Sequence, residues 1–516
     1  MNQTLISHPL FLRKHSVGLW AREHLFILNY LGALLTVMGL LLCLALIPYE
    51  WYHEGTRAGV PVSAFALPAA LSILIGLIAQ KGISTRAPTV RDAMIITGLG
   101  WLVISLVSAV PFMIGLHESF INAFFESVSG LTTTGITVLE GLDTMPKSIL
   151  LWRSFIQWIG GLGILTFFLA VGFRGGSAAA SLFGAEGHKI STSRPVPGIF
   201  NTVKILWGIY IGFTIASFFC YFFGGMNGFD ALNHCLTTIS TGGFSTHDAS
   251  IAYYGAHHYA HARFLEYAAT FFMLAGGINF LVHYQVFTGN IRALYRNFEM
   301  RWFWTLTLGA AGLILIDHFR QFPLTGNPLH QMEGAFRASL FQTASMISST
   351  GYSTLDINNP FFPALSKQIF LILMLIGGCV GSTAGGIKVL RIGILSRMFK
   401  TQLSRIAGPS RSISPVVVAG KTIPDSEIQR IAALACAWMI LIAVGAGITA
   451  SFSDLNAWQS LSGMASAVGN MGPFYFSVHK MASLSGIIKI TYIVGMLAGR
   501  LEILPIAVLF YRSTWR

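Results

Sequence analysis

The sequence predicts an all-α membrane protein that crosses the bilayer many times, and three observations support this fold class. Hydrophobic residues make up 53% of the 516 residues and charged residues only 10%, whereas an ordinary soluble domain carries about 25% charged residues. Apolar runs of membrane-crossing length recur along the whole chain. Shorter amphipathic stretches lie between them. This composition excludes a soluble enzyme, a disordered tail and a nucleic-acid-binding module.

The apolar runs predict about ten spans, because a transmembrane helix needs about 20 mostly apolar residues. The predicted spans are 25–47, 63–79, 93–115, 149–173, 203–224, 264–287, 302–319, 366–390, 429–450 and 485–511. The amphipathic stretches are too short to cross and are predicted to be re-entrant helices. They lie at 119–133, 228–240, 334–349 and 456–467.

The net charge of +13 is explained by orientation in the membrane. If the N-terminus is cytoplasmic, 23 of the 33 Lys and Arg residues fall in cytoplasmic segments, which is the positive-inside bias of membrane proteins. The alternation holds only if each short stretch enters and leaves on the outer side. We therefore expect both termini in the cytoplasm and no nucleic-acid partner.

A fourfold repeat organises the chain. Each short stretch follows one span, ends in a glycine-containing loop and precedes another span, and such internal repeats indicate repeated structural units. The loops align on Gly135, Gly242, Gly351 and Gly469. The predicted units are an N-terminal pair of helices at 1–80 and helix–pore helix–filter loop–helix repeats at 90–175, 200–290, 300–400 and 425–516.

The four loops predict a filter for a cation. A cation that crosses hydrocarbon must exchange its water shell for oxygen ligands, and loops that meet on one axis supply rings of backbone carbonyls. Glycine adopts the required backbone angles at little cost. One such loop alone is usually an ordinary turn or helix C-cap, but four at matching positions favour a central pore. The predicted filter residues are Thr133, Thr134, Gly135, Ile136, Ser240, Thr241, Gly242, Gly243, Thr350, Gly351, Tyr352, Val468, Gly469 and Asn470.

A glycine-rich run at 377–386 interrupts the second span of the third repeat. Each glycine costs about 1 kcal/mol relative to alanine in a helix, so the run predicts an intramembrane loop that acts as a gate below the filter. The alternative is a face of small residues for helix packing. Gly160-Gly161 and Gly276-Gly277 are shorter counterparts. The predicted gating residues are Gly377, Gly378, Gly381, Ser382, Thr383, Gly385, Gly386 and Arg500.

Two charged residues carry open alternatives. Arg500 lies deep in a predicted span, where a charge is costly and by default functional; the alternative is a local pair with Glu502 or a neighbouring helix. Glu126 lies in the first short stretch, where it either attracts cations or serves ordinary helix-terminus chemistry.

Two clusters of polar residues lie outside the repeats' loops. His247, His257, His258 and His261 share one external segment, which suggests a metal site, but no carboxylate partner is evident in the sequence and a solvated loop is favoured. The segment 388–430 carries eight Lys and Arg residues. It either docks an acidic partner or anionic lipid, or serves only as a topology signal.

Several longer motifs carry a resemblance to a known family. They are FFESVSGLTTTG, STGGFST, SSTGYST, WRSFIQWIGGLGI, GGCVGSTAGGIKVLR and AGRLEILP. With these, the chain resembles the superfamily of potassium transporters that includes the bacterial Trk and Ktr membrane subunits and the plant and fungal HKT proteins. The similarity covers about 93–516 and is greatest to the bacterial Trk branch, in which the extra N-terminal pair is also typical.

The resemblance implies potassium as the transported ion, because glycine at all four filter positions goes with potassium preference in the family. It also implies a homodimer, the bacterial inner membrane, and a position for Arg500 beside the intramembrane loop. A separate TrkA-like cytoplasmic subunit that binds ATP, ADP or NAD(H) is expected to control opening. No cofactor is expected in this chain itself.

The predicted function is potassium uptake through a gated, channel-like pathway driven by the membrane potential. Two alternatives stay open. A proton- or sodium-coupled symporter needs a titratable group in the membrane, for which Glu126, Arg500 and Glu502 are the candidates. A membrane enzyme would use the histidine-rich segment, although no catalytic triad or Walker loop is present.

Overall fold

The computed structural model describes residues 25–52, 59–84, 86–163, 199–324, 327–407 and 415–515. These residues form helices joined by loops, with one short antiparallel hairpin of β1 (Val417–Val418) and β2 (Lys421–Thr422). Parts of three predictions lie outside the described residues: the first 24 residues, the 164–173 portion of the fourth predicted span, and positions 408–414 of the basic segment.

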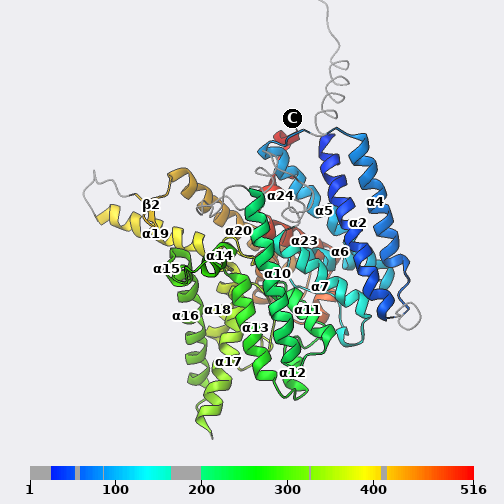
Figure 1. Ribbon diagram of the computed structural model, residues 1–516. Coiled ribbons are helices and arrows are strands. Elements are labelled where there is room, and N and C mark those ends of the chain that lie inside the picture. The colour runs from blue at the N-terminus through cyan, green and yellow to red at the C-terminus, as the bar shows by residue number, and fades with distance from the viewer. Residues whose placement is uncertain are drawn as a thin grey trace, which may run out of the picture.

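The N-terminal pair consists of α2 (Phe26–Tyr52) and α4 (Ser63–Gly82), which lie side by side at one edge of the molecule (Figure 1). Glycines let the two backbones approach closely, as small residues do between membrane helices. A Cβ added to Gly32 would lie 2.9 Å from the carbonyl oxygen of Gly76. Across the same contact, Gln80 Nε2 donates to Thr36 Oγ1 at 2.8 Å.

Four groups of helices follow, in the order that the repeats predict. The first group is α5 (Val90–Gly115), α6 (Phe120–Leu131) and α7 (Lys147–Leu162), and the second is α10 (Ile199–Phe223), α11 (Gly228–Ile239), α13 (Ala262–Gly277) and α14 (Phe280–Phe287). The third is α16 (Phe298–Gln321), α17 (Pro328–Ile347), α18 (Ala364–Ile376) and α19 (Val389–Ala407). The fourth is α20 (Asp425–Ser451), α21 (Ala457–Gly469), α23 (Gly486–Arg500) and α24 (Leu504–Phe510).

Short helices complete the connections between these elements. They are η1 (Leu142–Thr144), α12 (Ala252–Ala256), α15 (Ala293–Arg296), α22 (Val478–Ser483) and η2 (Arg512–Trp515).

The helices α6, α11, α17 and α21 are the predicted re-entrant helices and are called the pore helices below. A polar side chain caps the start of each one by accepting a hydrogen bond from the backbone three residues later, which fixes where the helix begins. The capping residues are Ser119, Asn227, Asn327 and Asn456.

The four groups close into a ring. The long helix that follows the pore helix in each group (α7, α13, α18 or α23) is called the second long helix. It packs against the pore helix of the next group: α7 against α11, α13 against α17, and α18 against α21. The helix α23 of the fourth group packs against α6 of the first. The loops that follow the four pore helices therefore meet around one axis.

Six helices in the described part of the chain are long and apolar enough to cross a membrane, namely α2, α4, α5, α10, α16 and α20. They account for six of the ten predicted spans. The other four predicted spans correspond to the second long helices of the groups, and these are not continuous. The helix α13 bends by 104° into α14, α18 ends at Ile376 and α23 ends at Arg500, while α7 ends at Leu162, just before the undescribed residues.

The breaks in these helices have a common cause. Three breaks fall at or just after a pair of glycines, and the fourth falls at a glycine followed by arginine. The pairs are Gly160-Gly161, Gly276-Gly277, Gly377-Gly378 and Gly499-Arg500. Glycine weakens the interior of a helix. The break in repeat three was predicted from its glycine-rich run. Apolar length alone does not detect the shorter breaks, which is why the sequence predicted uninterrupted spans in the other three repeats. On the side of the molecule away from α2 and α4, α19 projects outward with the β1–β2 hairpin near its end (Figure 1).

Candidate ion pathway and gate

The loops after the four pore helices share one backbone conformation. In each loop, a residue with φ between 51° and 54° ends the helix, and a glycine with positive φ follows two positions later. The first residues are Thr133, Thr241, Ser349 and Asn470, and the glycines are Gly135, Gly243, Gly351 and Gly472. The residue between them donates its amide to the carbonyl five positions earlier: Thr134 to Ser129, Gly242 to Thr237, Thr350 to Ser345 and Met471 to Ser466, at 2.9–3.0 Å.

This backbone equivalence corrects the alignment made from the sequence. Gly135 and Gly351 are equivalent as predicted, but their counterparts are Gly243 and Gly472, not Gly242 and Gly469. Gly469 is the last residue of α21, where a Cβ would meet the carbonyl oxygen of Met374 on α18. The sequence alignment failed because repeats two and four each offer two nearby glycines, and only the backbone angles distinguish them.

The four glycines are joined into a closed ring of close contacts. A Cβ added to Gly472 would lie 3.2 Å from the carbonyl oxygen of Thr134 in repeat one. A Cβ added to Gly135 would likewise meet the carbonyl oxygen of Gly242. A Cβ on Gly243 would meet the carbonyl oxygen of Thr350, and a Cβ on Gly351 would meet that of Met471. Glycine is therefore required twice at each position, by its positive φ and by the neighbouring carbonyl. Four backbone carbonyl oxygens from four loops thus lie in one ring.

Most of the predicted filter residues lie in these loops, which also contain three residues that the sequence analysis did not select. Val468 and Gly469 belong to the end of α21. Ser349, Met471 and Gly472 were not predicted, although the glycine three positions after Gly469 was a visible signal in the sequence. The buried side-chain oxygens Thr133 Oγ1 and Asn470 Oδ1 have no hydrogen-bond partner among the described residues.

The glycine-rich run of repeat three forms a non-helical segment, residues 377–388, between α18 and α19. Gly377, Gly381 and Gly386 all have positive φ, as does Lys388 with φ 83°. A continuous helix with a small-residue packing face, the alternative considered from the sequence, is therefore excluded. All the predicted gating residues except Arg500 lie in this segment, which we call the intramembrane loop.

The intramembrane loop lies against the ends of the pore helices of repeats two and three. Thr383 Oγ1 donates to the carbonyl oxygens of Ile239 at 3.0 Å and Gly276 at 3.1 Å. Thr241 Oγ1 in turn donates to Thr383 Oγ1 at 3.2 Å. The amide of Gly385 donates to Ser349 Oγ at 2.6 Å. Since Thr241 and Ser349 begin the loops that form the carbonyl ring, the intramembrane loop lies directly next to that ring.

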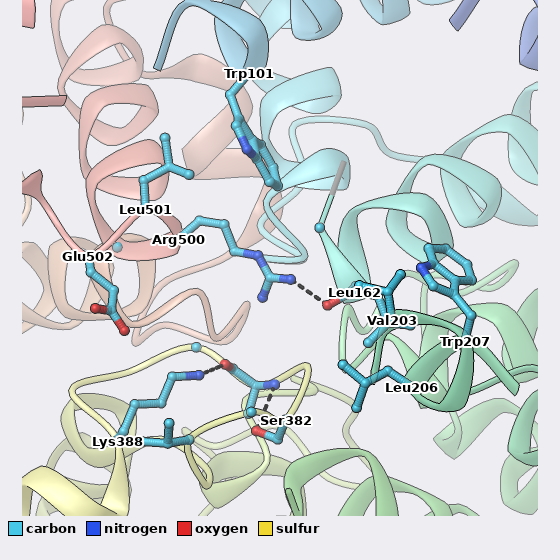
Figure 2. A pocket seen from close by; sticks show the side chains of 17 residues that line it. Trp101, Leu162, Val203, Leu206, Trp207, Ser382, Lys388, Arg500, Leu501 and Glu502 are labelled. Carbon is cyan, nitrogen blue, oxygen red and sulfur yellow. Dashed lines mark hydrogen bonds between the residues drawn. The ribbon is translucent and has the colours of Figure 1, made fainter. Parts of the chain in front are cut away.

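Arg500 joins this loop to repeat one. Its guanidinium donates to the carbonyl oxygen of Thr383 at 2.7 Å and to those of Gly160 and Gly161 at 2.6 and 2.5 Å. Figure 2 shows the Arg500 side chain extended across the gap toward the backbone beside Leu162. The predicted position beside the loop is thus observed. The carboxylate of Glu502, its suggested local partner, accepts from Arg391 at 2.6 Å.

A cavity opens beside Arg500 and the intramembrane loop (Figure 2). Both charged and apolar side chains line it, including Trp101, Val203, Trp207, Lys388, Arg500 and Glu502. Lys388 Nζ donates to the carbonyl oxygen of Ala384 within the loop. Cationic groups from two different repeats therefore face the same space next to the loop.

Glu126 lies behind the loop of repeat one and is fully buried. Arg153 Nε donates to it at 2.8 Å, and the Thr137 hydroxyl and the Val138 amide also donate to its carboxylate. Arg153 extends this network to the carbonyl of Ser245 in repeat two. The helix-terminus role considered for Glu126 was wrong, because the residue lies in the middle of α6 and no acidic residue occupies the first turn of that helix. Its carboxylate instead forms a buried pair with Arg153.

The histidine-rich segment differs from its prediction at one position. His247 has two carboxylate partners, with Nδ1 at 2.5 Å from Asp143 and Nε2 at 3.1 Å from Asp230. Both partners are distant from His247 in the sequence, which is why the sequence did not reveal them. His257, His258 and His261 are exposed. Within the described residues, no group of three or more His, Cys, Asp and Glu side chains is placed to hold a metal ion.

Comparison with known proteins agrees with this architecture. The sequence model of the TrkH family, described as a cation transport protein, matches residues 65–514. The chain is 33% identical over 437 residues to the Trk system potassium uptake protein TrkH of Vibrio parahaemolyticus, covering 83% of this chain and 86% of the relative. It is 33% identical over 448 residues to TrkG of Escherichia coli K12, covering 85% of this chain and 87% of that protein.

A solved structure shows the same fold. The crystal structure of the potassium transporter TrkH from Vibrio parahaemolyticus superposes with a TM-score of 0.78 at 29% sequence identity, covering 94% of this chain and 99% of that one. The family transports cations rather than catalysing a reaction. The apolar helices of this chain indicate that it crosses the membrane several times. The chain belongs to the TrkH family of cation transport proteins.

Proposed function

We propose that the chain takes up potassium through a gated, channel-like pathway. The observation that carries the proposal is the closed ring of carbonyl oxygens from Thr134, Gly242, Thr350 and Met471, built on four positive-φ or closely packed glycines. Such a ring replaces the hydration shell of a cation. The relatives are named potassium uptake proteins, and the residue after each ring carbonyl is a glycine with positive φ in all four loops.

The membrane potential supplies the driving force in this proposal. Moving one elementary charge inward gains about 2.3 kcal/mol per 100 mV, so accumulation needs no coupled ion. The carboxylates proposed for a symporter are both engaged, Glu126 by Arg153 and Glu502 by Arg391. No contact in the described residues favours the symporter over the channel-like pathway.

The intramembrane loop and Arg500 form the gate in this proposal. The loop lies beside the carbonyl ring through Thr383 and Gly385, and Arg500 holds it to Gly160 and Gly161. Opening requires the loop to leave this position, and thus requires the hydrogen bonds of Arg500 to break.

Control of the gate comes from outside this chain. The relatives are named as parts of a Trk system, and we propose a homodimer in the bacterial inner membrane, with both termini cytoplasmic and a TrkA-like nucleotide-binding subunit. Its docking site is the basic helix α19, which follows the intramembrane loop directly. Movement of α19 then acts on the loop through a continuous backbone.

Rubidium-86 flux into proteoliposomes under an imposed potential tests the function. Wild-type protein should show uptake that follows the potential, resists sodium and needs no proton gradient. Gly351→Ala should lose selective uptake, because its φ is +86° and its Cβ would meet Met471. Gly312→Ala is the matched control, since no atom lies near its Cβ. Equal, selective uptake by both variants would disprove the filter, and uptake that requires a proton or sodium gradient would establish the symporter.

A further inference from the structure

The second long helices of the four groups carry an equivalent five-residue segment just before they break. The segments are Gln-Trp-Ile-Gly-Gly from Gln157, Met-Leu-Ala-Gly-Gly from Met273, Met-Leu-Ile-Gly-Gly from Met374 and Met-Leu-Ala-Gly-Arg from Met496. The structure supports this equivalence, because a Cβ on Gly160, Gly276 or Gly499 meets the carbonyl at the end of the adjacent pore helix. Three residues depart from the pattern, Gln157, Trp158 and Arg500, and Gln157 is the one that reaches a filter loop.

Gln157 contacts the carbonyl ring directly. Its side chain is fully buried, and Nε2 donates to the carbonyl oxygen of Gly242 at 2.6 Å. Its Oε1 accepts from the amide of Phe244 at 3.1 Å. One amide group from repeat one therefore spans Gly243 and holds the residues on both sides of that filter glycine.

The presence of Gln157 also explains why Gly242 is a glycine. The equivalent residues in the other loops are Thr134, Thr350 and Met471, and Gly242 itself does not have the positive φ that would require glycine. A side chain here would instead displace the amide of Gln157, because a Cβ on Gly242 would lie 2.8 Å from Gln157 Nε2 and closer still to Cδ and Oε1. At this contact between repeats one and two, glutamine replaces methionine on α7 and glycine replaces threonine or methionine in the loop after α11, as a matched pair.

We propose that Gln157 is a positioning residue that fixes the repeat-two filter loop and thereby discriminates potassium from the smaller sodium ion. This rests on the proposed function. A smaller ion requires the ring carbonyls to move inward, whereas a carbonyl held by a side-chain amide keeps its position. The four carbonyl oxygens of the ring are therefore not equivalent, because the oxygen of Gly242 already accepts a hydrogen bond from Gln157.

The first experiment exchanges Gln157 for the residue of the other three repeats. Gln157→Met should retain rubidium-86 uptake into proteoliposomes, but sodium should inhibit it at about fivefold lower concentration, the change expected from the net contribution of one hydrogen bond. Gln429→Met, the same exchange at an exposed position of α20, should behave as wild type. Unchanged sodium inhibition in Gln157→Met would overturn the proposal. If Gln157→Met is not monodisperse, Gln157→Leu also removes the amide donor without adding a charge, and the same readout applies.

A second experiment tests the matched pair through its steric conflict. Gly242→Ala should abolish uptake in the wild-type background and recover it in the Gln157→Ala background, where the space is free. Gly135→Ala should abolish uptake in both backgrounds, because its partner is the Gly242 carbonyl. Tolerance of Gly242→Ala beside Gln157, or no recovery without Gln157, would refute the pairing. If Gly351→Ala also leaves selectivity intact, the filter itself is misplaced, and the proposed function fails rather than this inference alone.

Discussion

Arg500 donates a hydrogen bond to the carbonyl oxygen of Thr383 at 2.7 Å, and this contact joins the fourth repeat to the intramembrane loop of the third. The guanidinium also reaches the first repeat through Gly160 and Gly161. One side chain therefore holds three repeats together at the point where the second long helices break. The planar group with several donors suits this role better than an ammonium group would.

Replacing Arg500 should loosen the gate. Arg500→Gly restores the glycine that the other three repeats carry at this position and removes all three hydrogen bonds. We expect a several-fold rise in basal rubidium-86 flux without any regulatory subunit. Arg500→Lys is the informative control, because it keeps the charge but cannot make all three contacts. Unchanged flux from monodisperse Arg500→Gly protein would show that the residue is structural only.

Shortening the intramembrane loop should have a similar effect by another route. Deleting Gly381 and Ser382 withdraws the loop from the carbonyl ring while leaving α18 and α19 intact. Flux should increase and should no longer respond to substitution of Arg500, because the two changes act on the same closed state. Additive increases in the double variant, measured in the same vesicles, would mean that the loop and Arg500 act independently.

External pH should affect the contact between repeats one and two. Burial lowers the pKa of His247, but its hydrogen bonds to Asp230 and Asp143 outweigh this effect and raise the pKa above its usual value of 6.5. His234 interacts electrostatically with His247, and the backbone amide of Asp248 donates to Asp143. A raised folded-state pKa gives stability that is fully present below pH 6.5 and is lost as pH rises through the folded-state pKa.

Melting temperature against pH in detergent measures this contribution. The wild type should lose stability as pH rises from just below neutrality, and His247→Gln should show a flatter profile over the same range. Asp454→Asn is a suitable control, since that exposed carboxylate pairs with Lys480 elsewhere on the same face. Parallel profiles for wild type and His247→Gln would contradict the assignment.

The buried pair of Glu126 and Arg153 should be important for stability and neutral for ion coupling. Arg153→Met leaves the Glu126 carboxylate buried without its cation, which typically costs about 3–5 kcal/mol. The double variant with Glu126→Gln should recover part of that loss. Thermal unfolding measures both effects. If Glu126→Gln instead changed the dependence of uptake on a proton gradient, the symporter would gain direct support.

The sequence predicted the general plan because its signals are local. The glycine run at 377–386 cannot remain helical, and the pore helices begin at polar caps and end in recognisable loops. The alignment failed at Gly242 and Gly469 because residue identity does not record φ, and neighbouring glycines are interchangeable in a sequence comparison. The breaks in the second long helices of the other three repeats were missed for a related reason, since apolar length gives no measure of local helix stability.

Contacts between residues of different repeats could not be predicted from the sequence. Asp143 and Asp230 meet His247 only because the loops of repeats one and two adjoin. Gln157 and Gly242 likewise become a pair only when α7 packs against α11. The exchange of methionine for glutamine was visible in the four aligned segments, but its meaning depends on which carbonyl lies opposite.

The closure of the carbonyl ring within a single chain also bears on how ion preference changes over time. In a pore made of four identical subunits, one codon alters every quadrant at once. Here Thr134, Gly242, Thr350 and Met471 are encoded separately, so one substitution alters a single quadrant. Selectivity can then drift in small increments, with three unchanged quadrants preserving conduction while the fourth varies.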